Sequence, residues 1–290
     1  MHAAGRLRAA AATLVALAVL AGCAGGSGDD GAPPGAGPDA EVGAGADPVD
    51  LIGLWRVHDA EGESDPTWLR LDAWGLDLWR DCGLLTGSWS ASGTAMVTAV
   101  FGAVGDCGGS AVPEVPWLTS TAAYRSADEG WELLDATGSV VATLTVDGAP
   151  EPIPSVAEAY AEPPEVTAEA RAALAPPAAL PEGLAAVDAA ELEGRWVPAS
   201  GSGWPAEEPF VEFGADGSWT ASDGCNGAAG RWAVDQGGRL LATEGPMTAI
   251  ACDGVGVPGA VANAGRAGLD GGTLVLTDAA GEELLRLARD

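Results

Sequence analysis

The stretch SDGCNGAAGRW, Ser222–Trp232, places Cys225 inside a run of turn residues and ends on a tryptophan seven positions after that cysteine. A second stretch, RDCGLLTGSW at Arg80–Trp89, repeats the interval from Cys82 to its tryptophan, and a glycine stands five positions after the cysteine in both. Glycine and asparagine tolerate positive φ, so the backbone can bend sharply at these positions and turn the sulfur inward. We therefore expect each cysteine to point into the interior of a small, turn-rich fold and to anchor the turn around it.

Other landmarks repeat in the same order around these two stretches. LIGLW at Leu51–Trp55 aligns with LEGRW at Leu192–Trp196, and LLDATG at Leu133–Gly138 aligns with LTDAAG at Leu276–Gly281. A further cysteine follows 25 residues after the first in one copy and 27 residues after it in the other. Such ordered self-similarity is typical of an internal repeat, so we interpret the chain as a tandem duplication.

The N-terminus has the pattern of an export signal. Arg6 and Arg8 precede an apolar stretch, Ala9–Leu20, that is shorter than the roughly 20 residues a membrane-spanning helix needs. The next residues, LAGC at Leu20–Cys23, resemble a bacterial lipobox, in which a peptidase cuts before the cysteine and that cysteine is acylated. The sequence therefore predicts extracytoplasmic attachment to the cell membrane through lipid on Cys23. A plain secretory signal with an incidental cysteine is the alternative.

The remaining four cysteines are expected to form disulfides. Four cysteines can pair in three ways, and the duplication favours pairing within each repeat, Cys82 with Cys107 and Cys225 with Cys252. Disulfides persist in an exported protein. A metal site or a redox pair is the alternative, but the sequence has no Cys-x-x-Cys and only two histidines. We expect no metal and no cofactor.

Composition divides the chain into five segments. Residues 1–22 form the signal peptide, and 23–50, rich in Gly, Ala, Pro and Asp, form a disordered tether that lacks the apolar residues needed for folding. The two repeats occupy 51–149 and 191–290. The connector at 150–190 is rich in Pro and Ala, and we expect it to be semi-rigid.

Short apolar runs separated by glycine predict half-buried antiparallel strands in both repeats. Pro116 and Pro258 can begin one helix in each repeat, the first running through WLTSTAAY and the second through AVANAGRA before Gly268. We expect an α+β fold, mainly antiparallel β, built from two tandem small sheets that each carry one packed helix.

Five motifs of the second repeat carry a family resemblance: LEGRW, FVEFGADGSW, GCNGAAGRW, MTAIAC and TLVLTDAAG, which begin at Leu192, Phe210, Gly224, Met247 and Thr273. They resemble the META domain, the family that includes the bacterial heat-shock protein HslJ. The most specific residues are Gly224, Cys225, Asn226, Met247, Thr248 and Cys252. In the first repeat Asp-Cys-Gly, residues 81–83, replaces Gly-Cys-Asn, so that repeat is similar to the family only in a degenerate form.

The resemblance implies a small antiparallel half-barrel, often carried by exported lipoproteins and associated with stress and drug tolerance. It implies no catalytic residue. We therefore expect a non-enzymatic binding or scaffold module of the cell envelope, whose partner is an envelope protein or a cell-wall component.

Charge and aromatic content indicate which other functions are compatible with the sequence. Acidic residues number 42 against 13 basic ones, and the resulting net charge of −29 excludes nucleic-acid binding. The 11 tryptophans suggest carbohydrate or peptidoglycan binding as the second hypothesis. Tryptophans that recur in both repeats are expected in the cores, which leaves Trp117 and Trp204 as the candidate ligand platform. A hydrolase with two carboxylates is the third hypothesis, and turnover of wall polysaccharide would reveal it.

Overall fold

The computed structural model describes residues 46–290 except 108, 110, 202–205 and 252. The predicted signal peptide, the lipidation at Cys23 and the tether fall in the part of the chain that lies outside the described residues. Within the described residues no helix has both the length and the apolar character needed to cross a membrane.

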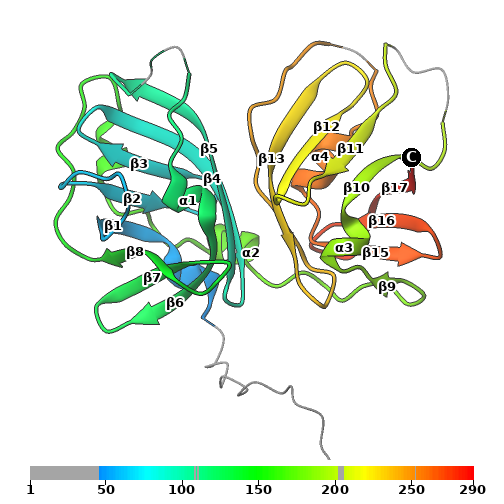
Figure 1. Ribbon diagram of the computed structural model, residues 1–290, viewed down its shortest axis with the longest axis horizontal. Helices are drawn as coiled ribbons and strands as arrows, with labels where there is room; N and C mark the ends of the chain where they lie inside the picture. Colours follow the sequence, from blue (N-terminus) through cyan, green and yellow to red (C-terminus); the bar gives the residue numbers. More distant parts are fainter. Residues whose placement is uncertain (1–45, 108, 110, 202–205, 252) are drawn as a thin grey trace, which may run out of the picture. The chain divides into compact units, whose positions relative to one another are not determined.

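The first sheet is a closed barrel of eight antiparallel strands (Figure 1). A short 3₁₀ helix, η1 (Pro48–Leu51), leads into them: β1 (Gly53–His58), β2 (Trp68–Leu71), β3 (Leu76–Arg80), β4 (Gly83–Ser92), β5 (Ala95–Gly105), β6 (Thr121–Ala127), β7 (Gly130–Asp135) and β8 (Val140–Thr145). Each strand pairs with the next along the chain, and β1 pairs with β8 to close the barrel. The weakest junction is β5 with β6, where a single pair, Ala95 with Ala123, is aligned.

Side chains fill the interior of this barrel, as expected for eight strands. Alternate residues of β3 face inward, so Leu76 and Leu78 join the core while Trp79 faces outward. The helix α1 (Pro116–Ser120) adds two apolar residues to the same core. The buried side chains include Leu51, Val57, Leu69, Leu71, Leu85, Met96, Trp117, Leu118, Tyr124, Leu133 and Leu144.

The second sheet has nine strands: β9 (Ala185–Ala186), β10 (Gly194–Pro198), β11 (Phe210–Phe213), β12 (Ser218–Ser222), β13 (Gly227–Val234), β14 (Leu240–Ala242), β15 (Arg266–Asp270), β16 (Thr273–Thr277) and β17 (Glu283–Arg289). Without β9, their order matches that of the first barrel, with β10 beside β17 as β1 is beside β8. Between β14 and β15 the described chain forms one isolated bridge, Arg239 with Arg266. This sheet therefore stays open where the first barrel is also weakest.

Matching tryptophans occupy matching places in the two sheets. The indole of Trp55 donates to the carbonyl of Leu51 at 2.9 Å, and the indole of Trp196 donates to the carbonyl of Leu192 at 2.8 Å. Both rings are buried in their cores, as predicted. In each case an indole N–H donates to a carbonyl four residues earlier, and that carbonyl lies just before strand β1 or β10. This recurrence supports the predicted duplication.

The turns that precede the last strands also match. Asp135 accepts hydrogen bonds through Oδ1 from the backbone of Thr137 and Ser139, and Asp278 does the same from Ala280 and Glu282. A glycine with positive φ follows three residues after each aspartate. The motif DATG and its counterpart DAAG therefore encode the same turn.

The fold class, α+β and mainly antiparallel β, is confirmed, and two details differ from expectation. The first sheet closes fully rather than forming a half-barrel. Both helices end earlier than predicted: α1 stops at Ser120 because Thr121–Ala127 pairs with β7, and α4 (Val257–Ala262) stops before β15. Gly268 lies within β15, where an added Cβ would come within 3.2 Å of Leu184. Strand pairing and close packing outweigh local helix propensity here.

The connector is ordered along much of its length. It contains η2 (Glu158–Ala161) and α2 (Ala168–Ala173), and α3 (Ala189–Leu192) begins at its end and continues into the second repeat. The side chain of Thr167 caps α2 by accepting from the backbone of Ala170 at 3.1 Å. The connector also supplies apolar side chains to a cluster on the outer face of the barrel, whose members are Leu54, Trp68, Trp79, Leu84, Val104, Ile153, Val156 and Ala161.

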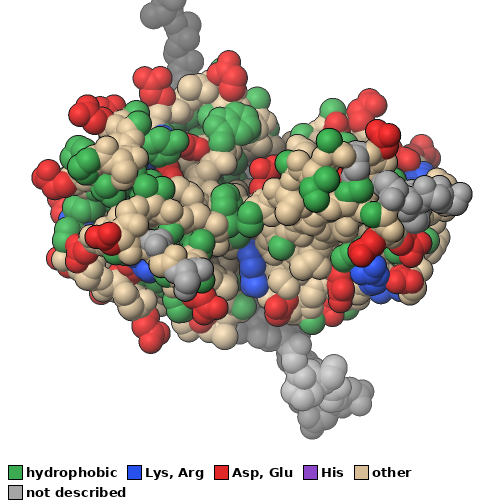
Figure 2. Space-filling view, turned by 90° about the horizontal axis from the view of Figure 1, so that it is seen from above, with side chains coloured by type: hydrophobic (Ala, Val, Ile, Leu, Met, Phe, Trp, Pro, Cys, Tyr) green, Lys and Arg blue, Asp and Glu red, His purple; other side chains and the backbone are tan. Residues whose placement is uncertain are grey.

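Carboxylates are spread over the visible surface in Figure 2 rather than gathered into one patch. The carboxylate of Asp77 on β3 is buried instead, and its Oδ2 lies 3.2 Å from Nη1 of Arg70. Burial outweighs the attraction of Arg70 and raises the pKa of Asp77 to about 6.

Asp77 makes the stability of the barrel depend on pH. Because the folded pKa lies above the unfolded value, the stabilising effect of the protonated form is complete below pH 3.8 and is lost as the pH rises through about 6. We expect Asp77→Asn to remove this dependence, a change of about 3 kcal/mol between the two limits. Urea denaturation at a series of pH values measures it. Asp128→Asn in an exposed turn should keep the wild-type profile, and an unchanged profile in Asp77→Asn would contradict the assignment.

Candidate functional site

The family motif comes together in the loop between β12 and β13. Asp223 begins this loop, and its Oδ1 accepts from the backbone N–H groups of Cys225 at 2.7 Å and Asn226 at 2.5 Å. Gly224 has φ +98°, a conformation that side chains rarely adopt. Burial acts to raise the pKa of Asp223, but the hydrogen bonds from Asn226 and Cys225 together lower it. The carboxylate is therefore held ionised as the centre of a tight turn.

Asn226 joins this turn to a second loop. Its buried amide donates through Nδ2 to Asp223 and to the carbonyl of Ile250, both at 3.0 Å, and accepts through Oδ1 from the backbone N–H of Ile250. Beside it, the N–H of Gly227 donates to Oγ1 of Thr248 at 3.0 Å. The side chain of Asn226 thus pairs with a peptide group much as a neighbouring strand would. We call this arrangement of Asp223, Asn226, Thr248 and Ile250 the asparagine clamp.

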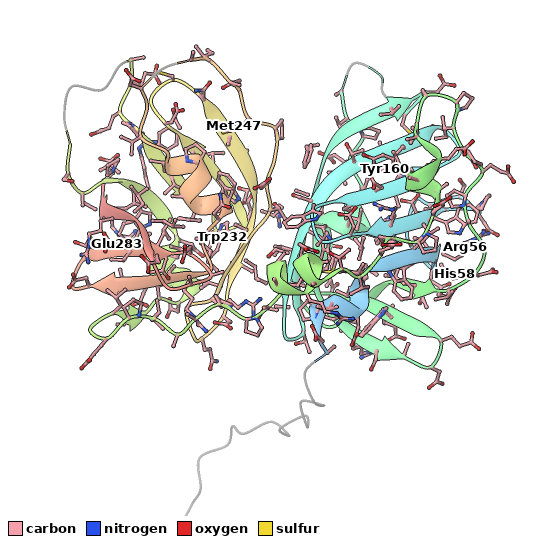
Figure 3. All side chains as sticks on the ribbon, turned by 180° about the vertical axis from the view of Figure 1, so that it is seen from behind. Arg56, His58, Tyr160, Trp232, Met247 and Glu283 are labelled. Carbon is pink, nitrogen blue, oxygen red and sulfur yellow. A yellow bond between two sulfur atoms is a disulfide. The ribbon has the colours of Figure 1, made fainter. Side chains whose placement is uncertain are left out.

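The clamp leaves two large apolar side chains on the surface. Met247 is 59% exposed and Ile250 is 64% exposed, although the backbone of Ile250 is fixed by Asn226. Figure 3 labels Met247 next to β13. The side-chain hydrogen bonds of Asn226 go to Asp223 and Ile250. Asn226 therefore has a structural role, fixing the loop that carries Ile250, rather than offering a reactive group.

One predicted disulfide is confirmed, and for the other only the bonded state of Cys225 is known. Cys82 and Cys107 are bonded, with their Cα atoms 4.7 Å apart. Cys225 is also disulfide-bonded. Its predicted partner, Cys252, lies outside the described residues.

The predicted ligand platform is wrong for Trp117. This side chain is only 2% exposed, because α1 turns it into the core of the barrel. Trp204 lies outside the described residues. The structure instead exposes Trp74, at 74%, on a turn in which Oδ1 of Asp72 accepts from the backbone of Trp74 and Gly75. The pattern Asp-x-Trp-Gly is a turn signal, and it could have placed Trp74 on the surface.

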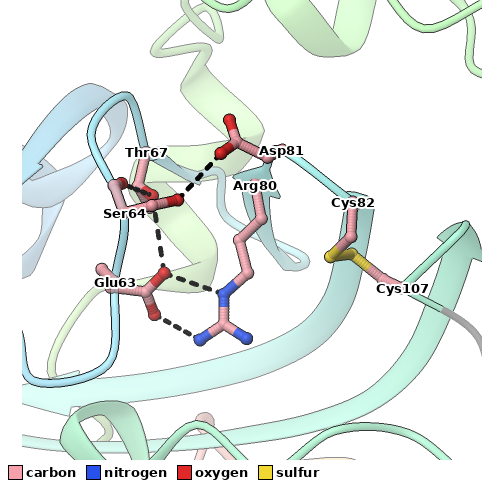
Figure 4. The surroundings of a disulfide bond; sticks show 7 residues. All are labelled: Glu63, Ser64, Thr67, Arg80, Asp81, Cys82 and Cys107. Carbon is pink, nitrogen blue, oxygen red and sulfur yellow. Dashed lines mark hydrogen bonds and ion pairs between the residues drawn. A yellow bond between two sulfur atoms is a disulfide. The ribbon is translucent and has the colours of Figure 1, made fainter.

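Sequence reasoning also missed a buried carboxylate near the first disulfide (Figure 4). The side chain of Glu63 is 5% exposed and accepts from Nε of Arg80 at 2.8 Å and from the indole of Trp117 at 2.6 Å. A second guanidinium nitrogen of Arg80 also donates to it. Among the described residues, no group of three or more His, Cys, Asp and Glu side chains could hold a metal ion.

Replacing Asn226 with alanine tests the clamp. The variant loses three side-chain hydrogen bonds, so we expect the C-terminal sheet to lose about 3 kcal/mol of unfolding free energy. Urea denaturation measures the loss. Asn263→Ala is the control, because Asn263 is exposed and its side chain makes one hydrogen bond among the described residues, to the carbonyl of Gly259. Equal losses in the two variants would contradict the clamp.

Comparison with known proteins gives one match. Residues 188–290 match the family model of the META domain. Neither the curated proteins nor the solved structures yield a match. The matched segment begins at Asp188, which caps α3, and contains β10 to β17 together with the whole asparagine clamp. Residues 188–290 of this chain are therefore similar to the META domain along their whole length.

Proposed function

We propose that this chain is a lipid-anchored binding or scaffold module of the bacterial cell envelope that acts without catalysis, in envelope stress or drug tolerance. The observation that carries the proposal is the asparagine clamp, which fixes Ile250 and Thr248, the neighbour of Met247, while the side chains of Met247 and Ile250 stay exposed on the META domain. A META domain is consistent with a non-enzymatic role in the envelope.

The chemistry of the clamp supports binding. Exposed apolar side chains commonly mark interaction sites when they gather in one place. A loop that is already fixed loses little conformational freedom when a partner docks, so less of the binding energy is spent on ordering it. The partner we propose is an envelope protein or a cell-wall component, reached from the membrane through lipid on Cys23.

The experiment compares wild type with the double variant Met247→Ser, Ile250→Ser in intact cells. Because both side chains are exposed, the double variant should fold normally. We expect it to lose crosslinked envelope partners and to restore stress survival poorly in a deletion strain. Val146→Ser, at another exposed apolar position, is the control. Full function and unchanged crosslinks in the double variant would refute the proposed surface.

Anchoring is tested separately by labelling cells with a radioactive fatty acid. We expect the label on wild type and not on Cys23→Ala, which should also leave the membrane fraction. Label retained on Cys23→Ala would refute the anchor.

A further inference from the structure

A pocket of about 480 Å³ opens on the outer side of the barrel, next to the Cys82–Cys107 disulfide. Trp68 of β2 and Trp79 of β3 line one side, and the connector segment Pro150–Pro154 lines another. This volume lies within the range of small-molecule sites. We call it the indole pocket.

One of the residues that line the indole pocket, Trp79, has an unpaired buried donor. Trp79 is 3% exposed, and its Nε1 has no hydrogen-bond partner among the residues that the structure describes. Its neighbour Trp68 donates to the carbonyl of Asp147 at 3.1 Å, and Trp89 donates to that of Asp72 at 2.7 Å. A buried donor without a partner has lost its hydrogen bond to water without replacing it, so a ligand oxygen that accepts from Nε1 recovers that loss.

The charges around the pocket restrict its ligand. Asp81, Asp106 and Glu151 line it, and Arg80 is the one cation among its lining residues. Arg80 is already paired with Glu63. An anion would therefore meet net repulsion, whereas hydroxyl or ammonium groups can donate to the three carboxylates.

We propose that the indole pocket binds a neutral or amino sugar. A sugar ring offers an apolar C–H face for the indoles and prolines, hydroxyl donors for the carboxylates, and an acceptor oxygen for Nε1 of Trp79. Because Nε1 is sealed in the present arrangement, the indole rotates or the Pro150–Pro154 wall moves outward when that oxygen enters. This inference rests on the proposed binding function and adds a site and a ligand class to it.

The test follows the indole N–H resonances of the full mature chain labelled with ¹⁵N-tryptophan. Glucose, glucosamine and glucuronate, which are neutral, cationic and anionic, are added at millimolar concentrations. The resonance of Trp79 is assigned by its absence from Trp79→Phe. We expect it to shift with glucose and glucosamine, and to shift little with glucuronate.

Trp79→Phe keeps the aromatic ring and removes the donor, so we expect about tenfold weaker binding, read from the Trp68 resonance. Trp74→Phe, on a turn outside this pocket, should bind as wild type does. The proposal is overturned if no sugar shifts Trp79, if glucuronate binds as well as glucosamine, or if Trp79→Phe binds normally. Any of these results with an intact Met247 and Ile250 effect would leave the proposed function standing and remove only the sugar site.

Discussion

Replacing Glu63 with alanine is expected to destabilise the N-terminal barrel by about 3–5 kcal/mol. The carboxylate holds the guanidinium of Arg80 through two nitrogens and the indole N–H of Trp117 through Oε1. Without the carboxylate of Glu63, the mostly buried guanidinium of Arg80 and the buried indole N–H of Trp117 both lose their partner. Removing one member of a buried pair costs more than the pair contributes, because the other charge stays behind. Urea denaturation followed by tryptophan fluorescence measures the loss.

Two variants separate the role of the charge from that of the position. Glu63→Gln keeps the shape and one acceptor oxygen, so its loss should lie between those of wild type and Glu63→Ala. Glu129→Ala, in the exposed turn between β6 and β7, should change the stability by less than about 0.5 kcal/mol. If Glu63→Ala were as stable as Glu129→Ala, the contact with Arg80 would have no structural role.

The landmarks that sequence reasoning found are those whose meaning is local. The residues from Cys82 to Trp89 and those around Trp55 lie within single turns and hairpins. Residues that are near one another in the sequence there are also near one another in the fold. The pairing of Cys82 with Cys107 was predictable because the duplication places one early and one late cysteine in each repeat, and in the structure the two residues flank one hairpin, β4 with β5. The lengths of the helices were not predictable, because residues 121–127 suit a strand or a helix and the partner strand β7 decides between them.

The parts of the site that depend on distant contacts could not be predicted. Glu63 lies in the polar run EGESD, which resembles an exposed loop, and its partner Trp117 is 54 residues away. Trp79 alternates with leucines in LDLWR, but the sequence does not say which face of that strand lies inside the barrel. The connector then covers the outward face. A buried tryptophan on the outside of the barrel is thus visible only once the strand pairing and the path of the connector are known.

The double variant Cys82→Ser, Cys107→Ser is expected to lose about 3.5 kcal/mol, the chain-entropy value for a closed loop with 25 residues of sequence separation. The bond lies at the open end of the hairpin formed by β4 and β5, where the N–H of Cys107 already donates to the carbonyl of Cys82 at 2.9 Å. Because strand pairing brings these ends together in the folded barrel, the covalent bond acts mainly on the unfolded chain.

Loss of the bond should change the dependence of stability on urea as well as the unfolding free energy itself. Removing the bond lets the unfolded chain expand, so the urea dependence of the unfolding free energy should become steeper while the midpoint falls. The double variant is more informative than reduction of the wild type, because reduction would also open the disulfide of Cys225. Unfolding curves of wild type and variant at one pH provide the comparison. A lower midpoint with unchanged steepness would mean that the bond acts on the folded barrel instead, by holding β4 and β5 in register.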